Sequence, residues 1–172
     1  QSMEVHLGFG KMDALKDPRV LNAMEALQEY LETEQPKFVV KTESLVNVVK
    51  NSYQVLNEDR EEMYIIPQDP RTLEQTLFLF NSANPDDRQQ LVTDDYREGR
   101  ISVRLHNYGS IAYLTFLDAS RRKISALFDP LRSDYPEMEV QITGGLALMM
   151  QMIDYISWSQ IQSFGLALAV IS

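Results

Sequence analysis

The sequence predicts an α+β domain in which two β-α-β units share one antiparallel sheet. Segments 3–9 and 100–106 carry apolar residues at every second position, as strands with one covered face do. Each is followed by a segment with helical apolar spacing and then by another short strand, so the β-α-β pattern spans 3–41 and again 100–143. Two such units merged into one four-stranded sheet, with the helices on one face, form the ferredoxin-like arrangement.

The first unit has clear helix-start chemistry. After strand 3–9 and a polar loop at 10–16, Asp17 precedes Pro18. Aspartate is a favoured N-cap and proline is tolerated at the first helical position, so a helix should begin here. Its apolar stripe should be Val20, Met24, Leu27 and Leu31. Pro36 ends the unit, and 37–41 reads as a short strand.

A helical insertion is predicted at 44–98, between the two units. Ser44 should cap one helix and Asp69, followed by Pro70, a second, while the charged segment 57–62 between them should be exposed. The predicted apolar face of the first helix is Leu45, Val48, Val49, Ser52, Val55 and Leu56, and that of the second is Leu73, Leu77, Phe78 and Phe80.

The second unit repeats the first. After strand 100–106, a helix is predicted over 111–131, and Met138, Val140 and Ile142 alternate as a fourth strand. The apolar residues of that helix are Leu114, Leu117, Ile124, Leu127, Phe128 and Leu131. Gly144 and Gly145 then form a candidate hinge before a C-terminal helix.

The C-terminal segment has no charged side chain after Asp154. Residues 155–172 therefore predict the start of a transmembrane helix; the alternative is an ordinary buried C-terminal helix. The candidate membrane-entry or association residues are Trp158, Ile161, Phe164, Leu168 and Ile171. Residues 1–2 look like an expression scar, which leaves 3–154 as the predicted domain.

Composition excludes several classes of function. The chain has a net charge of −9 and a pI near 4.7, which argues against binding to nucleic acid or, through this domain, to an anionic membrane surface. It has no cysteine, so neither disulfides nor thiolate metal sites exist.

No catalytic, cofactor-binding or metal site is predicted, and we expect no enzymatic activity. His6 and His106 fall on the polar side of their strands and could meet on the exposed sheet face, but further metal ligands are missing. The acidic pairs at 86–87 and 94–95 do not have the spacing of a calcium loop. Gly144 and Gly145 lack the remaining residues of a phosphate-binding motif.

The order of the segments carries a family resemblance. The chain contains D-P-R-V-L-N-A-M-E-A-L-Q-E-Y-L, Y-I-I-P with L-E-Q-T-L-F-L-F, and D-D-Y-R-E-G-R-I-S-V-R-L, and it closes with Y-P-E-M-E-V-Q-I-T-G-G-L-A-L and S-Q-I-Q-S-F-G-L-A-L-A-V-I. Over 3–171 it resembles the first large extracytoplasmic loop of RND-superfamily exporters, particularly the MMPL type, which lies between the first two transmembrane helices.

The resemblance implies a periplasmic porter domain of an inner-membrane, proton-driven exporter of hydrophobic or amphiphilic, lipid-like substrates. It also implies the membrane, a sister periplasmic loop and other subunits as partners, with the insertion meeting them, and no cofactor. The isolated fragment should pair through residues 156–171, whose apolar side chains lack their partners. The alternative is a free-standing, ferredoxin-like regulatory module that binds a small ligand, with a C-terminal helix packed on its own domain.

Overall fold

The computed structural model describes residues 1–83, 89–108 and 112–145, together with residues 148, 152 and 155, and the structural statements below refer to these. The strands are β1 (Ser2–Gly8), β2 (Val39–Glu43), β3 (Glu98–Leu105) and β4 (Glu139–Thr143), and they form one sheet in the order β2-β3-β1-β4. Every neighbouring pair is antiparallel. The prediction of an α+β fold with a four-stranded antiparallel sheet is confirmed.

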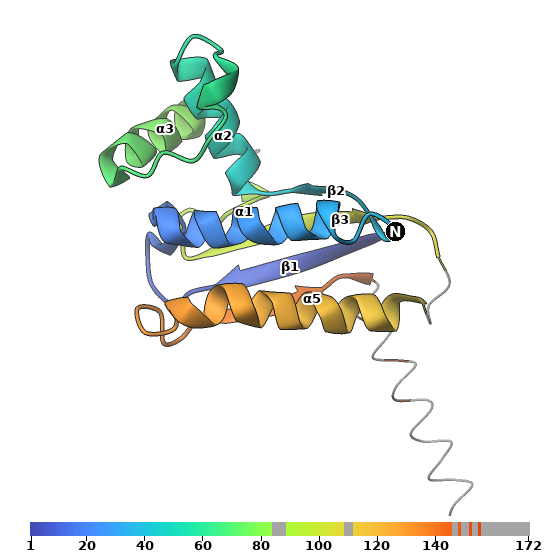
Figure 1. Cartoon of the computed structure of the whole chain (residues 1–172). Helices are drawn as coiled ribbons and strands as arrows, with labels where there is room; N and C mark the ends of the chain where they lie inside the picture. Colours follow the sequence, from blue (N-terminus) through green and yellow to red (C-terminus); the bar gives the residue numbers. More distant parts are fainter. Residues whose placement is uncertain (84–88, 109–111, 146–147, 149–151, 153–154, 156–172) are drawn as a thin grey trace, which may run out of the picture.

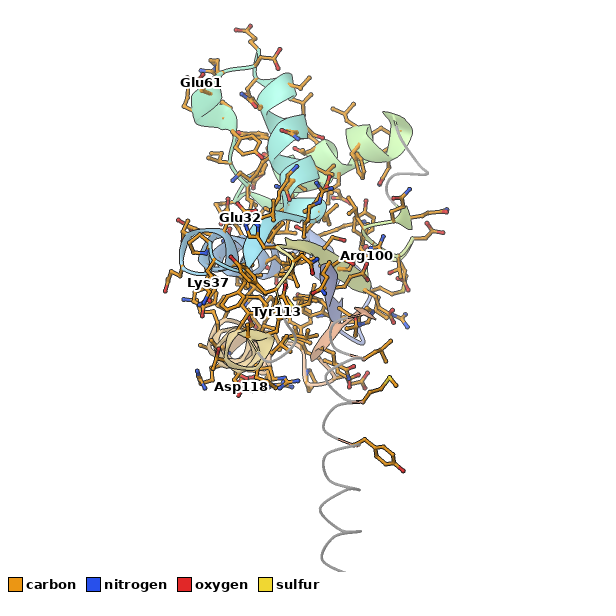
Figure 2. The ribbon with its side chains drawn as sticks, turned by 90° about the vertical axis from the view of Figure 1, so that its right-hand side faces the viewer. Glu32, Lys37, Glu61, Arg100, Tyr113 and Asp118 are labelled. Atoms are coloured by element: carbon orange, nitrogen blue, oxygen red, sulfur yellow. The ribbon has the colours of Figure 1, made fainter. Side chains whose placement is uncertain are left out.

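Two helices connect the strands within the two β-α-β units. Helix α1 (Pro18–Thr33) follows β1, and α5 (Ala112–Phe128) follows β3. Both cover the same face of the sheet, whereas Arg100 lies on the opposite face (Figures 1 and 2). The centre of the core is therefore the layer of side chains between this helix pair and one sheet face, and the same buried cluster continues into the insertion through Val49, Leu73 and Leu77.

The core contains the predicted alternating and helical positions. All four residues of the predicted α1 stripe are fully buried, as are Met3, Val5, Leu7 and Ile101 of the sheet. On α5 the prediction was partly wrong, because Leu114 is 41% exposed while Tyr113 and Phe116 fill the core beside it. The buried face of this helix is thus offset from the one that leucine positions alone suggested.

Local chemistry starts the helices where expected. The Asp17 carboxylate accepts a hydrogen bond from the Arg19 N–H at 2.9 Å. The Asp69 carboxylate accepts one from the Thr72 N–H at 2.9 Å, in the first turn of α3 (Pro70–Ala83). Each bond satisfies a donor that would otherwise lack a partner in the first helical turn.

Between β2 and β3 the chain forms the α2–α3 hairpin, defined here as α2 (Leu45–Leu56), the short 3₁₀ helix η2 (Glu61–Met63) and α3. Its helices contact each other, and the hairpin extends away from the sheet (Figure 1).

Strand β3 spans 98–105 where 100–106 was predicted, and three further differences concern β2, the loop before α1 and the N-terminus. Strand β2 starts at Val39 rather than 37, because the carbonyl of Gln35 accepts the N–H groups of both Phe38 and Val39 and holds the preceding residues in a turn. The expected polar loop at 10–16 contains a 3₁₀ helix, η1 (Ala14–Lys16), in which Ala14 and Leu15 are buried.

The third difference lies at the N-terminus. Ser2 belongs to β1, and the carbonyl of Gln1 accepts a hydrogen bond from the Leu105 N–H at 2.9 Å. Residues 1 and 2, which look like an expression scar in the sequence, therefore extend the sheet. A third 3₁₀ helix, η3 (Asp129–Leu131), follows α5.

Candidate functional site

A buried polar network fixes the base of the α2–α3 hairpin to α1. The Gln28 side chain donates hydrogen bonds to Thr42 Oγ1 at 3.0 Å and to Asn47 Oδ1 at 2.9 Å. It also accepts one from the Ser44 hydroxyl at 2.7 Å, and the Ser44 oxygen caps α2 by accepting from the Val46 N–H at 3.1 Å. The predicted cap at Ser44 is confirmed, and it is part of a tertiary contact.

Lys50, on α2, connects α1 to the chain that follows η2. The Lys50 ammonium contacts the Glu25 carboxylate at 2.5 Å and lies 4.5 Å from the centre of the Tyr64 ring. Only 18% of this lysine side chain is exposed, so the ion pair is less screened than a surface pair. The charge and the ring together orient the hairpin relative to α1.

The far part of the hairpin leaves apolar side chains uncovered. Phe78 is 69% exposed, Leu56 47% and Leu79 44%, and these three residues line one shallow hollow with Glu74 and Gln75. We call these five residues the hairpin patch. The prediction that Phe78 belongs to the buried face of α3 was wrong, because Thr76 occupies that face instead.

The connection between the two helices is acidic. Residues 58–62 are all exposed and include four carboxylates, Glu58, Asp59, Glu61 and Glu62, and one cation, Arg60. Glu61 lies at the outer end of the hairpin (Figure 2). This charged segment is exposed as predicted.

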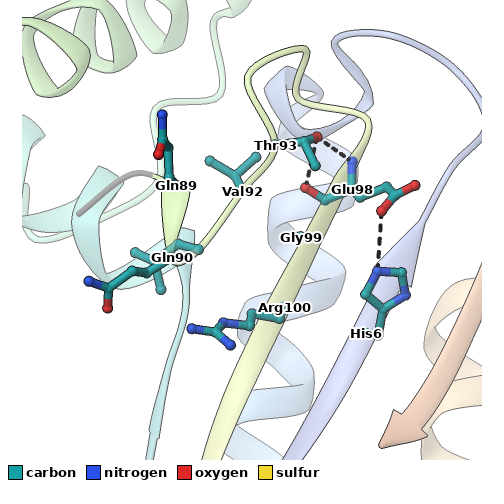
Figure 3. Close-up of a pocket in the computed structure, with 9 residues that line it drawn as sticks. His6, Gln89, Gln90, Val92, Thr93, Glu98, Gly99 and Arg100 are labelled. Atoms are coloured by element: carbon teal, nitrogen blue, oxygen red, sulfur yellow. Dashed lines mark hydrogen bonds and ion pairs between the residues drawn. The ribbon is translucent and has the colours of Figure 1, made fainter. Parts of the chain in front are cut away.

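A second surface feature is a groove on the open face of the sheet, where residues 91–93 run antiparallel beside β3 (Figure 3). The Leu91 carbonyl accepts from the Arg100 N–H at 3.1 Å, and the Thr93 N–H donates to the Glu98 carbonyl at 2.9 Å. This close approach requires Gly99, because a Cβ there would lie 2.8 Å from Leu15 Cδ1 and 3.3 Å from the Leu91 oxygen.

The charged groups in the groove are already paired. His6 Nε2 lies 3.4 Å from a Glu98 carboxylate oxygen, and the Arg100 guanidinium lies 3.1 Å from the Glu4 carboxylate. One Arg100 nitrogen, Nε, is buried without a hydrogen-bond partner among the described residues. The charged groups that line the groove therefore carry both signs.

The two histidines do not meet, contrary to the expectation from their strands. The sheet register pairs His6 with Arg100, whereas His106 follows the opposite end of β3. At about 3.4 Å per residue, the six positions from Arg100 to His106 separate them by about 20 Å. The strands do pair, but their antiparallel register places the histidines at opposite ends of the sheet.

Hydrogen bonds lower the pKa of the carboxylate at Asp95. The Thr93 hydroxyl and the Arg97 N–H donate to one of its oxygens at 2.7 and 3.1 Å, which stabilises the ionised form. Asp95 thus closes the turn before β3.

Among the residues that the structure describes, no group of three or more potential metal ligands is found.

A second network holds the start of α1 against the chain that precedes β4. The Tyr135 hydroxyl donates to the Asp17 carboxylate at 2.8 Å, and Arg19 contacts Asp17 and Asp134 at 2.8 and 2.7 Å. Burial alone would raise the pKa of Asp17, but hydrogen bonds from Arg19 and Tyr135 outweigh it and lower that pKa. Burial and the Asp17 carboxylate raise the pKa of Tyr135 to about 12.

Gly144 and Gly145, the candidate hinge, lie directly after β4. Gly144 has φ +97°, a conformation that favours glycine, and a Cβ there would meet the backbone of Met3 and Glu4 at 3.4–3.5 Å. No Cβ contact lies within 4 Å of Gly145. The first glycine is therefore required by the backbone turn, and the second is not required by packing.

The candidate membrane-entry residues Trp158, Ile161, Phe164, Leu168 and Ile171 lie outside the described residues, as does the pairing predicted for 156–171. In the part of the chain that is described, no helix combines the length and the apolar character needed to span a membrane. Leu148, Met152 and Tyr155 are described and are helical, and their side chains are 62%, 64% and 76% exposed.

Comparison with known proteins identifies no family. The chain matches no protein-family model, no curated protein and no solved structure. The features of the molecule that bear on its function are therefore the α2–α3 hairpin, the groove and the segment that follows β4.

Sequence reasoning missed the groove. Its parts come from β1, β3 and residues 89–93, which are separated in the sequence. The one local signal was Gly99, a glycine near the start of β3 at the position where residue 92 pairs with the strand.

Proposed function

We propose that this chain is the extracytoplasmic, porter-type loop domain of a proton-driven exporter of the RND/MMPL type, with hydrophobic or amphiphilic substrates. Its fold would be ferredoxin-like, because β1 and β3 are the central strands and both crossover helices cover one face. The domain would guide substrate and contact neighbouring domains, while the proton-coupling residues would lie in membrane helices outside this chain.

The observation that carries the proposal is where the chain enters and leaves the sheet. Strands β1 and β4 are antiparallel neighbours, and Glu4 near the start of β1 pairs with Thr143 at the end of β4. The chain therefore enters and leaves the domain at adjacent positions, about 5 Å apart at the strand level. This geometry suits a domain inserted between two neighbouring membrane helices.

The segment after β4 adds support. Leu148, Met152 and Tyr155 occur at helical spacing, and each is mostly exposed rather than packed on the sheet or on α5. The sequence then continues without a charged residue from 155 to 172. Exposed apolar residues on one helical face, followed by an uncharged sequence, are the expected beginning of a helix bound for lipid.

The alternative, a free-standing module that binds a small ligand, has one favourable observation, the groove at Arg100 with its unpartnered Nε. That reading also predicts a C-terminal helix packed on its own domain. The exposure of Leu148, Met152 and Tyr155 does not match that prediction, so the exporter reading is preferred.

Cysteine accessibility in cells tests the proposal, and because this domain has no cysteine of its own, labelling gained over the unsubstituted protein reports on the introduced residue. Glu61→Cys, at the exposed end of the hairpin, is introduced into the full-length gene product. A maleimide that cannot cross the inner membrane should label it in intact spheroplasts, and the unsubstituted protein is the background control. Labelling only after membrane disruption, or a fully soluble gene product, would refute the proposal.

A further inference from the structure

The outer part of the α2–α3 hairpin combines an uncovered apolar surface with a concentrated negative charge. The hairpin patch exposes Leu56, Phe78 and Leu79 around a hollow, and Val55 beside it is 66% exposed. Isolated exposed apolar residues are common, but several large ones that line one hollow mark an interaction surface.

The charge close to the patch is mostly negative. Residues 58–62, which follow Leu56 in the chain, carry four carboxylates and a single arginine, which lies 3.6 Å from Glu62, and Glu74 belongs to the patch itself. Arg71, one turn before Glu74 on α3, is an exposed cation. The hairpin therefore combines an apolar hollow with an excess of carboxylates nearby. Complementary charges around an apolar contact set which partner is accepted and how fast it associates.

The acidic segment begins in the turn that ends α2. Glu58 and Asp59 have φ +63° and +56°, the left-handed conformation that commonly follows a helix. The Asp59 N–H donates to the Gln54 carbonyl at 3.1 Å, which closes this turn. The carboxylates after it therefore lie at the outer end of the hairpin, where Glu61 is labelled in Figure 2.

We infer that the hairpin patch binds a protein surface that is apolar and bordered by lysine and arginine. A second copy of this chain would place the acidic segments against each other, and an anionic lipid surface would repel them. The inference rests on the proposed function only in expecting the partner on the extracytoplasmic side; the surface and its chemistry stand without it.

Site-specific crosslinking in cells tests this partner chemistry. The photoreactive amino acid p-benzoylphenylalanine replaces Phe78 in the full-length protein, and the crosslinked peptide is identified by mass spectrometry. We expect an adduct with another protein surface, at a peptide that contains aliphatic residues flanked by Lys or Arg. The control places the same group at Leu114, which is also exposed but lies on α5, and it should give no such adduct.

The charge requirement is tested in the same cells. The combined variant E58Q/D59N/E61Q/E62Q should lower the yield of the Phe78 adduct at least about fivefold, because the complementary charges are removed. These residues are exposed, so thermal unfolding of the variant should match that of the parent. The control R121Q/R122Q, on α5, should leave the yield unchanged.

Each contrary outcome is distinct. Adducts only with a second copy of the chain, adducts only with lipid, no adduct above the Leu114 control, or a yield that neutralisation leaves unchanged would each overturn the inference. An adduct with a cytoplasmic protein that shows the expected basic border would support the surface while refuting the exporter location.

Discussion

The buried Gln28 side chain is the most direct test of how the hairpin is anchored. Gln28 is 6% exposed and makes three side-chain hydrogen bonds, to Thr42, Asn47 and Ser44. Gln28→Leu keeps a similar volume but removes one acceptor and both donors. Any loss of stability should therefore come from the polar network and not from a cavity.

The size of the effect follows from what each partner retains. The Thr42 hydroxyl still donates to Glu32 at 2.6 Å, and Asn47 Oδ1 still accepts from the Ser44 N–H at 2.9 Å. Losing those two bonds should cost about 1 kcal/mol each. The Ser44 hydroxyl is fully buried and loses the one acceptor it has among the described residues, which adds about 1–3 kcal/mol. Because leucine regains some apolar burial, we expect a net loss of about 3 kcal/mol.

Urea unfolding of the purified domain measures this change. With a slope near 2 kcal/mol per molar, the midpoint should fall by about 1.5 M. Gln75→Leu, the same substitution at an exposed position, should change stability by less than about 0.5 kcal/mol. Ser44→Ala should cost at least about 1 kcal/mol less in the Gln28→Leu background than alone. A loss below about 1 kcal/mol, or strictly additive effects, would refute the reasoning.

Four further predictions concern the rest of the domain. Because the folded state lowers the pKa of Asp17, the contribution of this carboxylate to stability is complete above about pH 4 and is lost as the pH falls. In the Asp17→Asn variant, the free energy of unfolding should therefore depend less on pH in that acid range. Because the pKa of Tyr135 is raised to about 12, the contribution of its hydroxyl to stability is complete below about pH 10 and is lost toward pH 12. Tyr135→Phe should therefore remove this loss of stability at alkaline pH. Gly99→Ala should cost about 1–3 kcal/mol in urea unfolding, since its methyl group would collide with the side chain beneath the strand. Asp59→Gly should raise stability by up to about 1 kcal/mol by relieving a left-handed φ of 56°.

Matched control variants distinguish these effects from a nonspecific loss of stability. Asp118→Asn, on an exposed ion pair of α5, should leave acid unfolding unchanged. Tyr155→Phe, at an exposed tyrosine, should leave the alkaline profile unchanged. Gly145→Ala should cost less than Gly99→Ala, because open space surrounds its Cβ position. Equal losses at the two glycines would refute the role assigned to close packing, and an unstabilised Asp59→Gly would refute the strain argument.

Short-range chemistry explains what could be predicted from sequence. Asp17 and Asp69 mark helix starts because a carboxylate beside an N-terminal turn satisfies local donors, whatever the rest of the fold. The alternation in β1 and β3 gave the buried face correctly, since the side-chain period of a strand is fixed.

The misses arise from long-range packing. Hydrophobicity favoured Phe78 for the buried face of α3, but that face takes Thr76, whose hydroxyl bonds to the Thr72 carbonyl at 2.8 Å and can therefore be buried. Similarly, the pairing of β1 with β3 could be expected from the sequence, but the register of the two strands could not. The register places the His6 side chain beside Glu98 and not beside His106.

The position of the hairpin between β2 and β3 has a consequence for how such a domain can diversify. These strands are antiparallel neighbours, which a turn of two to five residues is enough to join. A connection about tenfold shorter would lower the closure entropy by only about 2 kcal/mol, so the sheet tolerates excursions of very different length. The α2–α3 hairpin, which we propose as the binding element, can accordingly be lengthened or exchanged while the four-stranded sheet stays the same, and on that proposal a graft at this junction would transfer partner choice from one scaffold to another.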